Sequence, residues 1–472
     1  MYLPLLLVVV LVVSVGALAL LIAARNPRLR TIPLAERLVC LFFTVALIYP
    51  VLRYELMSRF HLPSPVLGAW QDLAALVLVA VLLAGRRQPL PMTEKSVWGA
   101  AAILVCGAVN ALVAPDWILS LYGARLTYLP MAFFVVGLML PPSPGSTRRI
   151  SWHMANLAGL SALLGLTLSY AFPAYWLDVI AFSSQDRGWG QDVFARAGGY
   201  RMTGTLIDPV SFGFLSAAGV IIYVCLSFQA RRSARWGAAL GATLCLTACG
   251  LSLSRGAWAM AAAGLTITAP FVVRDWARLA KAAVALILLA AVLWFAAPDR
   301  TTRQAEDLVM LTWEKTLLEG NSQREQMWDE AVEGFVRKPF GFGLGAVGHT
   351  AGRFPERLRP DTPMVTDGWY FKLMAEGGAP LLVSFVVFQA LFVFSLWRRL
   401  RLEADPDRRL LLIVTGGLFL GASAMAAGCN LWDLYFTSHL MWFLTGLSMQ
   451  GEARPARKPR ARMAMLRPRP AF

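Results

Sequence analysis

Charged residues are scarce in this sequence of 472 residues, where Asp, Glu, Lys and Arg together make up 15% of the chain. A soluble domain of this length would contain roughly 25% charged residues. Apolar residues make up 57%, and the mean hydropathy is +0.57. This composition excludes a soluble enzyme, a secreted disulfide-rich scaffold and a disordered chain. A polytopic helical membrane protein remains.

Cysteine pairs in polar loops are also missing. The six cysteines all lie in or beside apolar runs, so the sequence predicts no disulfide framework. Cys245 and Cys249 share a predicted helix face, where they are more typical of small membrane-helix residues than of a metal site. Paired-cysteine metal motifs and a Gly-x-Ser-x-Gly elbow are absent. We therefore expect neither a metal nor a cofactor.

Long apolar runs, by contrast, are abundant. A bilayer-crossing helix needs about 20 mainly apolar residues, and we expect an all-α polytopic membrane protein with about 13 transmembrane helices. The first run has no preceding basic residue and is too long for a cleaved signal. The predicted spans are approximately 3–24, 34–52, 66–84, 96–114, 124–140, 152–172, 206–228, 236–253, 257–273, 279–297, 376–397, 410–428 and 432–449.

The basic residues predict the orientation. More than half of the 44 Lys and Arg residues lie in alternate loops and in the C-terminal tail. Because Lys and Arg mark cytoplasmic loops, the N-terminus is predicted to face outward and the C-terminus to face the cytoplasm. The tail, 450–472, is rich in Pro and Arg, and we expect it to be disordered and attracted to lipid rather than to nucleic acid.

The polar residues between spans concentrate on the external face. One external segment, about 173–205, interrupts the first ten spans within 1–297. A larger one, 298–375, precedes the last three spans in 376–449. The cytoplasmic loops are short by comparison. This asymmetry indicates that binding or chemistry takes place on the external side.

The large external segment is predicted to be partly helical. Residues 305–318 fit a first helix. Ser322, with Glu325 three residues later, is a capping box for a second helix, which Pro339 ends. The glycines that follow match Gly-x-Gly-x-x-Gly over 343–348, but a helix rather than a strand precedes them. We therefore expect a tight turn instead of a dinucleotide site.

Three arginines lie on this predicted external face. Arg255 falls in a Ser-Arg-Gly turn between two apolar runs, and Arg201 precedes another run. Arg324 lies in the first turn of the capped helix, on the same face as Trp328. Each could equally be structural, for example by snorkelling to the interface. As a set they favour a membrane-surface pyrophosphate, since guanidinium groups stay charged and bind phosphate through two parallel hydrogen bonds.

Two residues near the end of the large segment could act as a base. Asp367 could accept a proton from a sugar hydroxyl, or it could cap a helix that begins near Trp369. His349 is the single histidine of the large segment and could equally be solvated. Asp433 and His439, in the last span, are expected to form an internal polar pair or to line a water cavity.

Four short motifs, in this order, resemble the O-antigen ligase and polymerase family of bacterial envelope polysaccharide enzymes. The likeness is closest over about 200–400 and extends to the hydropathy of the whole chain. The motifs are Arg201-Met-Thr-Gly204-Thr205 with Asp208-Pro209, then Ser254-Arg255-Gly256, then Arg324-x-x-x-Trp328 with Gly341, Gly343 and Gly345, and finally Tyr370 through Glu376-Gly377-Gly378.

The resemblance implies that a glycan on undecaprenyl pyrophosphate is transferred to an acceptor hydroxyl at the periplasmic face of the bacterial inner membrane. Ligases of the family carry His-Asn at the exit of the large loop, where this sequence has Asp367-Gly368. An acidic residue at this place, here Asp367, is more similar to the polymerases of the family. The implied roles are catalysis by Asp367 or His349, pyrophosphate binding by Arg201, Arg255 and Arg324, and substrate binding by Asp208, Trp328, Tyr370 and Glu376.

We therefore expect a metal-independent glycosyltransferase that polymerises lipid-linked repeat units. The alternative within the family is a ligase that transfers the glycan to lipid A core. A transporter of the same glycan would need a polar path, and the few deep charges disfavour it. Expected partners are the lipid-linked oligosaccharide, the acceptor glycan and membrane lipids, with a chain-length regulator and a flippase as further candidates. The sugars and their linkage stay open.

Overall fold

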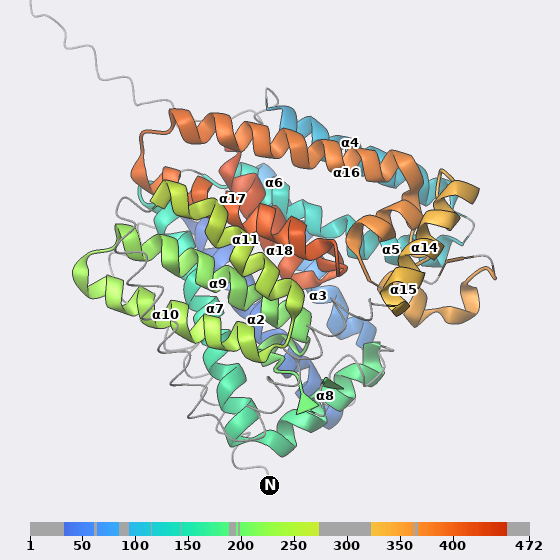
Figure 1. The fold of residues 1–472 in the computed structure, drawn as a ribbon, viewed down its shortest axis with the longest axis horizontal. Coiled ribbons are helices and arrows are strands. Elements are labelled where there is room, and N and C mark those ends of the chain that lie inside the picture. Colours follow the sequence, from blue (N-terminus) through green and yellow to red (C-terminus); the bar gives the residue numbers. More distant parts are fainter. Residues whose placement is uncertain are drawn as a thin grey trace, which may run out of the picture.

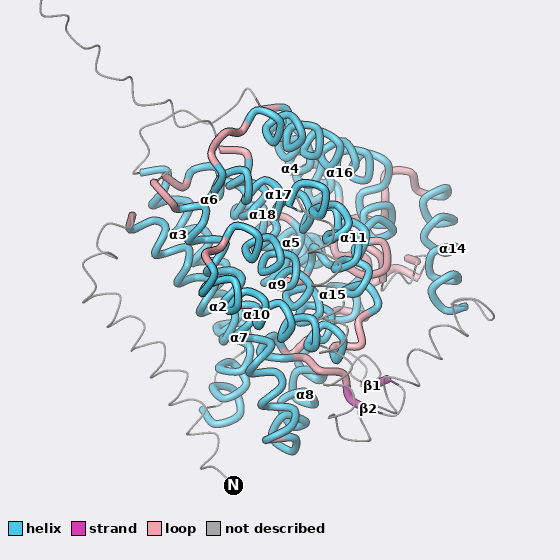
Figure 2. The backbone as a smooth tube through the Cα atoms, turned by 60° about the vertical axis from the view of Figure 1, so that its left-hand side comes forward, coloured by secondary structure: helices cyan, strands magenta, loops and turns pink. Residues whose placement is uncertain are grey.

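The computed structural model describes residues 33–60, 64–84, 94–114, 116–141, 143–187, 195–196, 199–272, 322–360, 362–363 and 367–450. These residues form a helical bundle (Figure 1). The one strand pair among them is two residues long on each side (Figure 2). The all-α expectation is thereby confirmed. The predicted spans 3–24 and 279–297, the helix over 305–318 and the tail beyond 450 lie outside the described residues.

The first described helices overlap the predicted spans, except α8, which lies in the segment predicted to be external. The predicted span 124–140 is divided among α5, η1 and α6, and α5 begins before it, at Trp117. The bounds are α2 (Leu34–Phe60), α3 (Ser64–Ala84), α4 (Lys95–Val113), α5 (Trp117–Thr127), η1 (Leu129–Met131), α6 (Ala132–Met139), α7 (Ser146–Ala171) and α8 (Pro173–Arg187).

The middle of the chain forms the centre of the bundle. An antiparallel pair, β1 (Ala195–Arg196) and β2 (Gly199–Tyr200), leads into it. The elements that follow are η3 (Gly204–Leu206), α9 (Pro209–Gln229), α10 (Arg232–Leu251) and α11 (Arg255–Val272). Most side chains of α9 are buried, because α7, α10, α11 and α17 pack around it.

The C-terminal elements close the bundle around α9 and α4. The long helix α16 runs beside α4 (Figure 1). Its path breaks at Gly378, which has a φ of 61°. The bounds are α14 (Ser322–Arg337), α15 (Gly348–Arg353), η5 (Pro355–Arg357), α16 (Trp369–Leu402), α17 (Pro406–Ala426), η6 (Leu431–Asp433) and α18 (Tyr435–Ser448).

The described helices fit a polytopic membrane protein. Seven of the helical segments in the described residues are long and apolar enough to cross a bilayer. The total of 13 spans stays a prediction. The helix predicted from Ser322 with its stop before Pro339 is observed as α14.

Small residues allow the central helices to approach closely. A Cβ atom at Gly219 of α9 would lie 2.6 Å from the Cys245 sulfur of α10, so glycine is required at this crossing. Cys245 and Cys249 of α10 are both buried free thiols, and Cys245 packs on Gly219 in the α9–α10 interface. Cys245 therefore serves as a small packing residue at this crossing.

Candidate functional site

Two of the predicted arginines meet at the turn between α10 and α11. The Arg201 Nε donates to the Ser252 carbonyl at 3.0 Å, and the Met202 N–H donates to the Leu251 carbonyl at 3.1 Å. Arg201 is 4% exposed, while Arg255, which begins α11, is half-buried. The contacts thus bring residues 54 positions apart to one turn. Arg201 also stabilises that turn, because it satisfies a buried carbonyl.

The Asp208 carboxylate is hydrogen-bonded to backbone N–H groups at the start of α9. It is the N-cap of α9, and its carboxylate accepts from the Val210 N–H at 3.2 Å and the Ser211 N–H at 2.7 Å. Pro209 occupies the first helical position, where its missing N–H costs nothing. With 1% of its surface exposed, Asp208 is accounted for by capping.

The start of α16 packs against α14. The Trp328 ring stacks on the Phe371 ring, with 5.1 Å between centroids and 9° between planes. Gly368 is buried beneath the Trp328 indole with a φ of 98°, a backbone conformation that favours glycine. Asp367, half-buried, comes directly before it. Arg324 lies in the first turn of α14, and its side chain is outside the described set.

Three candidate residues lie next to glycines that pack around the end of α17. Asp367 and His349 are each adjacent to a glycine that packs on the connection between α17 and η6, and Arg255 precedes a glycine that packs on Met425 in the last turn of α17. The structure therefore gathers the arginine turn, the α16 start and the α15 start around one short segment. The contacts are Gly256 on Met425, Gly368 on the Ala427 carbonyl and Gly348 on the Asn430 amide.

A buried ion cluster beneath these residues was not predicted. The Lys372 Nζ lies 2.5 Å from Asp433 Oδ2 and 3.5 Å from Glu376 Oε2, and all three side chains are 0% exposed. Thr127 of α5 completes the cluster, 3.3 Å from both Lys372 and Asp433. The partner of Asp433 is therefore Lys372 and not His439, so the predicted Asp–His pair was wrong. His439 instead packs on Phe133.

Glu376 anchors the glycine-rich loop from inside the protein. Its carboxylate accepts from the Gly345 N–H at 3.0 Å, and its carbonyl accepts from the Gly343 N–H at 3.0 Å. A Cβ at Gly345 would lie 2.2 Å from the Leu119 carbonyl, and its φ is 79°. The Gly-x-Gly-x-x-Gly stretch is thus a tight, backbone-packed turn, as predicted. Glu376 has no exposed surface toward a substrate.

The Tyr370 hydroxyl forms hydrogen bonds that connect α16 with α17. Its hydroxyl accepts from the Gln389 Nε2 at 3.0 Å and donates to the Ser423 carbonyl at 3.3 Å. These bonds join the start of α16 to α17. Because Ser423 precedes the connection on which Gly368 packs, Tyr370 helps to hold the candidate residues in place.

A cavity of about 200 Å³ opens beside the glycine-rich loop, between that loop and the start of α5. Asp116 and Arg357 face each other in its wall at 3.1 Å. The Leu119 N–H and the Arg357 guanidinium hold the pKa of Asp116 below its usual range. Among the side chains that the structure describes, no predicted catalytic or pyrophosphate-binding residue lines this cavity.

Part of the chain is similar to a known protein family. Residues 240–386 match a family model described as O-antigen ligase. None of the curated proteins matches the chain. The matched region includes Arg255, Arg324, His349 and Asp367. The match to this family lends no support to the alternative that the protein is a transporter.

Proposed function

We propose, because residues 240–386 match a family model described as O-antigen ligase, that the protein is a polysaccharide polymerase. It would join undecaprenyl-pyrophosphate-linked oligosaccharide repeat units at the periplasmic face of the inner membrane. The family assignment supports a membrane glycosyltransferase that acts on lipid-linked glycans. The choice of a polymerase rests on Asp367, because ligases of the family carry histidine at that place.

The position of Asp367 carries the proposal. It lies one residue before a buried glycine that packs on Trp328 and on the Ala427 carbonyl. The turn that bears Arg255 packs on Met425, two residues before Ala427. An acid and an arginine thus come from segments that pack on neighbouring residues at the end of α17, which suits a reaction that needs a base for a hydroxyl and a cation for a leaving phosphate.

The proposed reaction develops negative charge on its leaving group. Breaking the bond between sugar and pyrophosphate places growing negative charge on the pyrophosphate, and a fixed guanidinium stabilises it without reorganising. Asp367 would orient the acceptor hydroxyl and take its proton as the new glycosidic bond forms. Direct displacement would invert the anomeric centre. His349, next to the glycine that packs on Asn430, is the second candidate for the base.

A ligase is the second candidate, and the description of the matching family favours it. The two activities differ in the acceptor. A defined lipid-linked repeat unit should give a longer lipid-linked polymer if the protein is a polymerase. Given lipid A core as well, a ligase would instead attach the glycan there.

The deciding experiment uses purified protein, the lipid-linked repeat unit and the Asp367→Asn variant. This substitution keeps the shape and removes the charge. We expect polymer formation to fall by about 100-fold or more, the usual scale of losing a general base, while donor binding persists. His349→Gln is the matched comparison. Unchanged turnover in Asp367→Asn with loss in His349→Gln would transfer the role to His349.

A further inference from the structure

The exposed side of α14 changes from acidic to apolar along the helix. Glu325 and Asp329 are exposed near its start. Val332 and Val336 follow, with 44% and 72% of their surface exposed, and they lie on one side of the helix because they are four residues apart. Phe340, three residues past the end of α14, is 77% exposed. Val332, Val336 and Phe340 form an exposed apolar strip.

The opposite side of α14 is packed against the protein. Ala331 is 0% exposed, and Trp328 stacks on Phe371 at the start of α16. Among the described elements, α14 makes its main contacts with α16, and it lies at the edge of the bundle (Figure 2). A surface helix in water turns polar residues away from its packing side. The C-terminal half of α14 instead turns two valines outward, which is typical of a helix at a membrane surface.

The end of the apolar strip is held against the kink of α16. The Pro339 carbonyl accepts from the Ala379 N–H at 2.8 Å. A Cβ atom at Gly378 would collide with the Pro339 carbonyl, so the two backbone segments are in direct contact. Phe340, the residue after Pro339, is therefore fixed at the level of Gly378 along α16.

The length of α16 places Gly378 close to a membrane boundary. This helix has 34 residues, whereas about 20 are enough to cross the hydrocarbon. Arg398 lies near its C-terminal end, where basic residues reach a membrane surface, and about 20 residues before it is Gly378. Between the two, Val383 and Val387 are 56% and 46% exposed, as expected for side chains that meet lipid. Phe340 is therefore at the opposite boundary, whichever way the chain is oriented.

We infer that the apolar strip docks on the lipid interface, with Phe340 deepest. A lipid surface is the partner because the strip ends at the level where the lipid-facing residues of α16 begin. Interfacial helices bury their apolar side by about 5–10 Å at the boundary between headgroups and acyl chains. Glu333 and Arg337 are exposed beside the valines, and a long side chain such as that of Arg337 keeps its charge in the headgroup layer. This inference goes beyond the proposed function and holds for a polymerase and a ligase alike.

Docking would set the height of the candidate site above the membrane. Trp328 contacts Phe371, which precedes Gly378 by seven residues, so Trp328 lies further from the hydrocarbon than Phe340. Arg324 lies one turn before Trp328. This end of α14 would then stand at the headgroup layer, where the pyrophosphate of a lipid-linked substrate lies.

The test measures the depth of nitroxide labels on the full chain in nanodiscs of phosphatidylcholine and phosphatidylglycerol. The labels are attached to Asp329→Cys, Val332→Cys, Val336→Cys and Phe340→Cys, each in a cysteine-free background. Depth is reported by the ratio of collisions with oxygen, which concentrates in lipid, to collisions with a water-soluble nickel chelate. We expect this ratio to rise along α14 from Asp329 to Phe340. Adding Phe340→Asp should make the Val336 label shallower, because a carboxylate is costly in lipid.

Two reference labels calibrate this measurement. Val387→Cys, on the lipid-facing side of α16, gives the value for lipid, and Glu356→Cys, exposed in η5, gives the value for water. Labels at Val336 and Phe340 that match the water reference would overturn the inference. Labels shielded from both oxygen and nickel would overturn it as well, since protein would then cover the strip, and magnetic coupling between labels would identify that protein as a second copy of the chain. A label at Asp329 as deep as the one at Phe340 would also contradict docking, because the gradient along α14 would be missing.

Discussion

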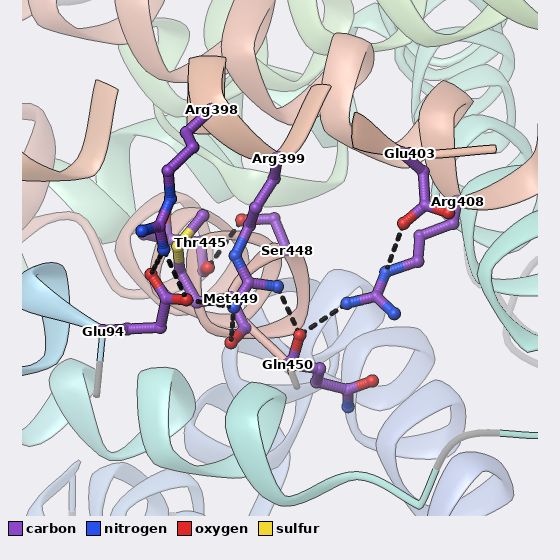
Figure 3. A network of polar contacts seen from close by, with 9 residues as sticks. All are labelled: Glu94, Arg398, Arg399, Glu403, Arg408, Thr445, Ser448, Met449 and Gln450. Atoms are coloured by element: carbon purple, nitrogen blue, oxygen red, sulfur yellow. Dashed lines mark hydrogen bonds and ion pairs between the residues drawn. The ribbon is translucent and has the colours of Figure 1, made fainter. Parts of the chain in front are cut away.

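The helix α16 carries an ion cluster near each end, and the two are built differently. Near its start, Lys372, Glu376 and Asp433 are 0% exposed. Near its other end, Glu94 of α4 accepts from Arg398 and Arg399, as Figure 3 shows. There the Arg398 side chain is 55% exposed, while those of Arg399 and Glu94 are 13% and 10% exposed.

The second network holds the ends of several helices. Arg399 and Arg408 both donate to the Gln450 carbonyl, just after α18 (Figure 3). The Gln450 amide donates to the Gly137 carbonyl at 2.8 Å and to the Leu140 carbonyl at 2.6 Å. This network joins the ends of α4, α6, α16, α17 and α18, on the side that the basic loops predict to be cytoplasmic.

The two clusters differ in the desolvation free energy that their charges lose on folding. Two charges taken from water pay a large desolvation penalty, which only close pairing offsets. Water already solvates an exposed pair, so its loss changes little. A cluster that is expensive to bury, and whose lysine follows Asp367 by five residues, indicates a part of the protein that must keep one geometry. The pair of the exposed Arg398 with Glu94 instead contributes little.

The two ends of α16 are expected to face opposite sides of the membrane. In a cysteine-free background, a cysteine at Glu356, exposed in η5, should react with an impermeant maleimide in intact cells. One at Arg401, exposed near the end of α16, should react only after permeabilisation. Reaction in the reverse order would invert the orientation and with it the periplasmic site.

Removing the lysine of the buried cluster should have the largest effect on stability. Lys372→Met leaves two buried carboxylates without their cation, and we expect a loss of about 3–5 kcal/mol. Thermal unfolding in detergent, followed by tryptophan fluorescence, measures it. Lys372→Met with Asp433→Leu removes an opposite charge and should recover part of the loss. No recovery in the double variant would mean that the pair is not the source of the destabilisation.

The loop anchored by Glu376 should tolerate no side chain at Gly345. Gly345→Ala adopts a strained positive φ, and its Cβ would collide with the Leu119 carbonyl. We expect a loss of about 1–3 kcal/mol, measured by the same unfolding assay. Gly352→Ala is the control, since a Cβ there meets nothing within 4 Å. Equal effects at both positions would contradict the tight packing of the loop.

Loss of the exposed Arg398 should have the smallest effect on stability. Arg398→Ala removes a half-exposed partner while Arg399 still pairs with Glu94, and we expect a loss of at most about 1 kcal/mol. The loss should shrink further in high salt because exposed charges are screened. A change as large as that of Lys372→Met would show that burial does not separate the two ends of α16.

Much of the architecture could be predicted from the sequence, because many elements have a local cause. Hydropathy placed most of the long described helices but not α8, and Ser322, Glu325 and Pro339 placed α14. The N-cap Asp208 with Pro209 was readable in the same way, although a substrate role was preferred for it. The glycines of 343–348 were correctly assigned to a tight turn because no strand precedes them.

Tertiary structure alone decided which charges meet. Lys372 and Asp433 are 61 residues apart and Arg125 and Asp72 are 53 apart, so local spacing gives no hint of either pair. Hydropathy gives a helix its length but not its rotation or its neighbours. Those depend on small residues, such as Gly219 against Cys245, that let particular helix faces approach. Once two helix faces are in contact, a buried charge is paired with an opposite charge on the neighbouring helix, because an unpaired buried charge is destabilising.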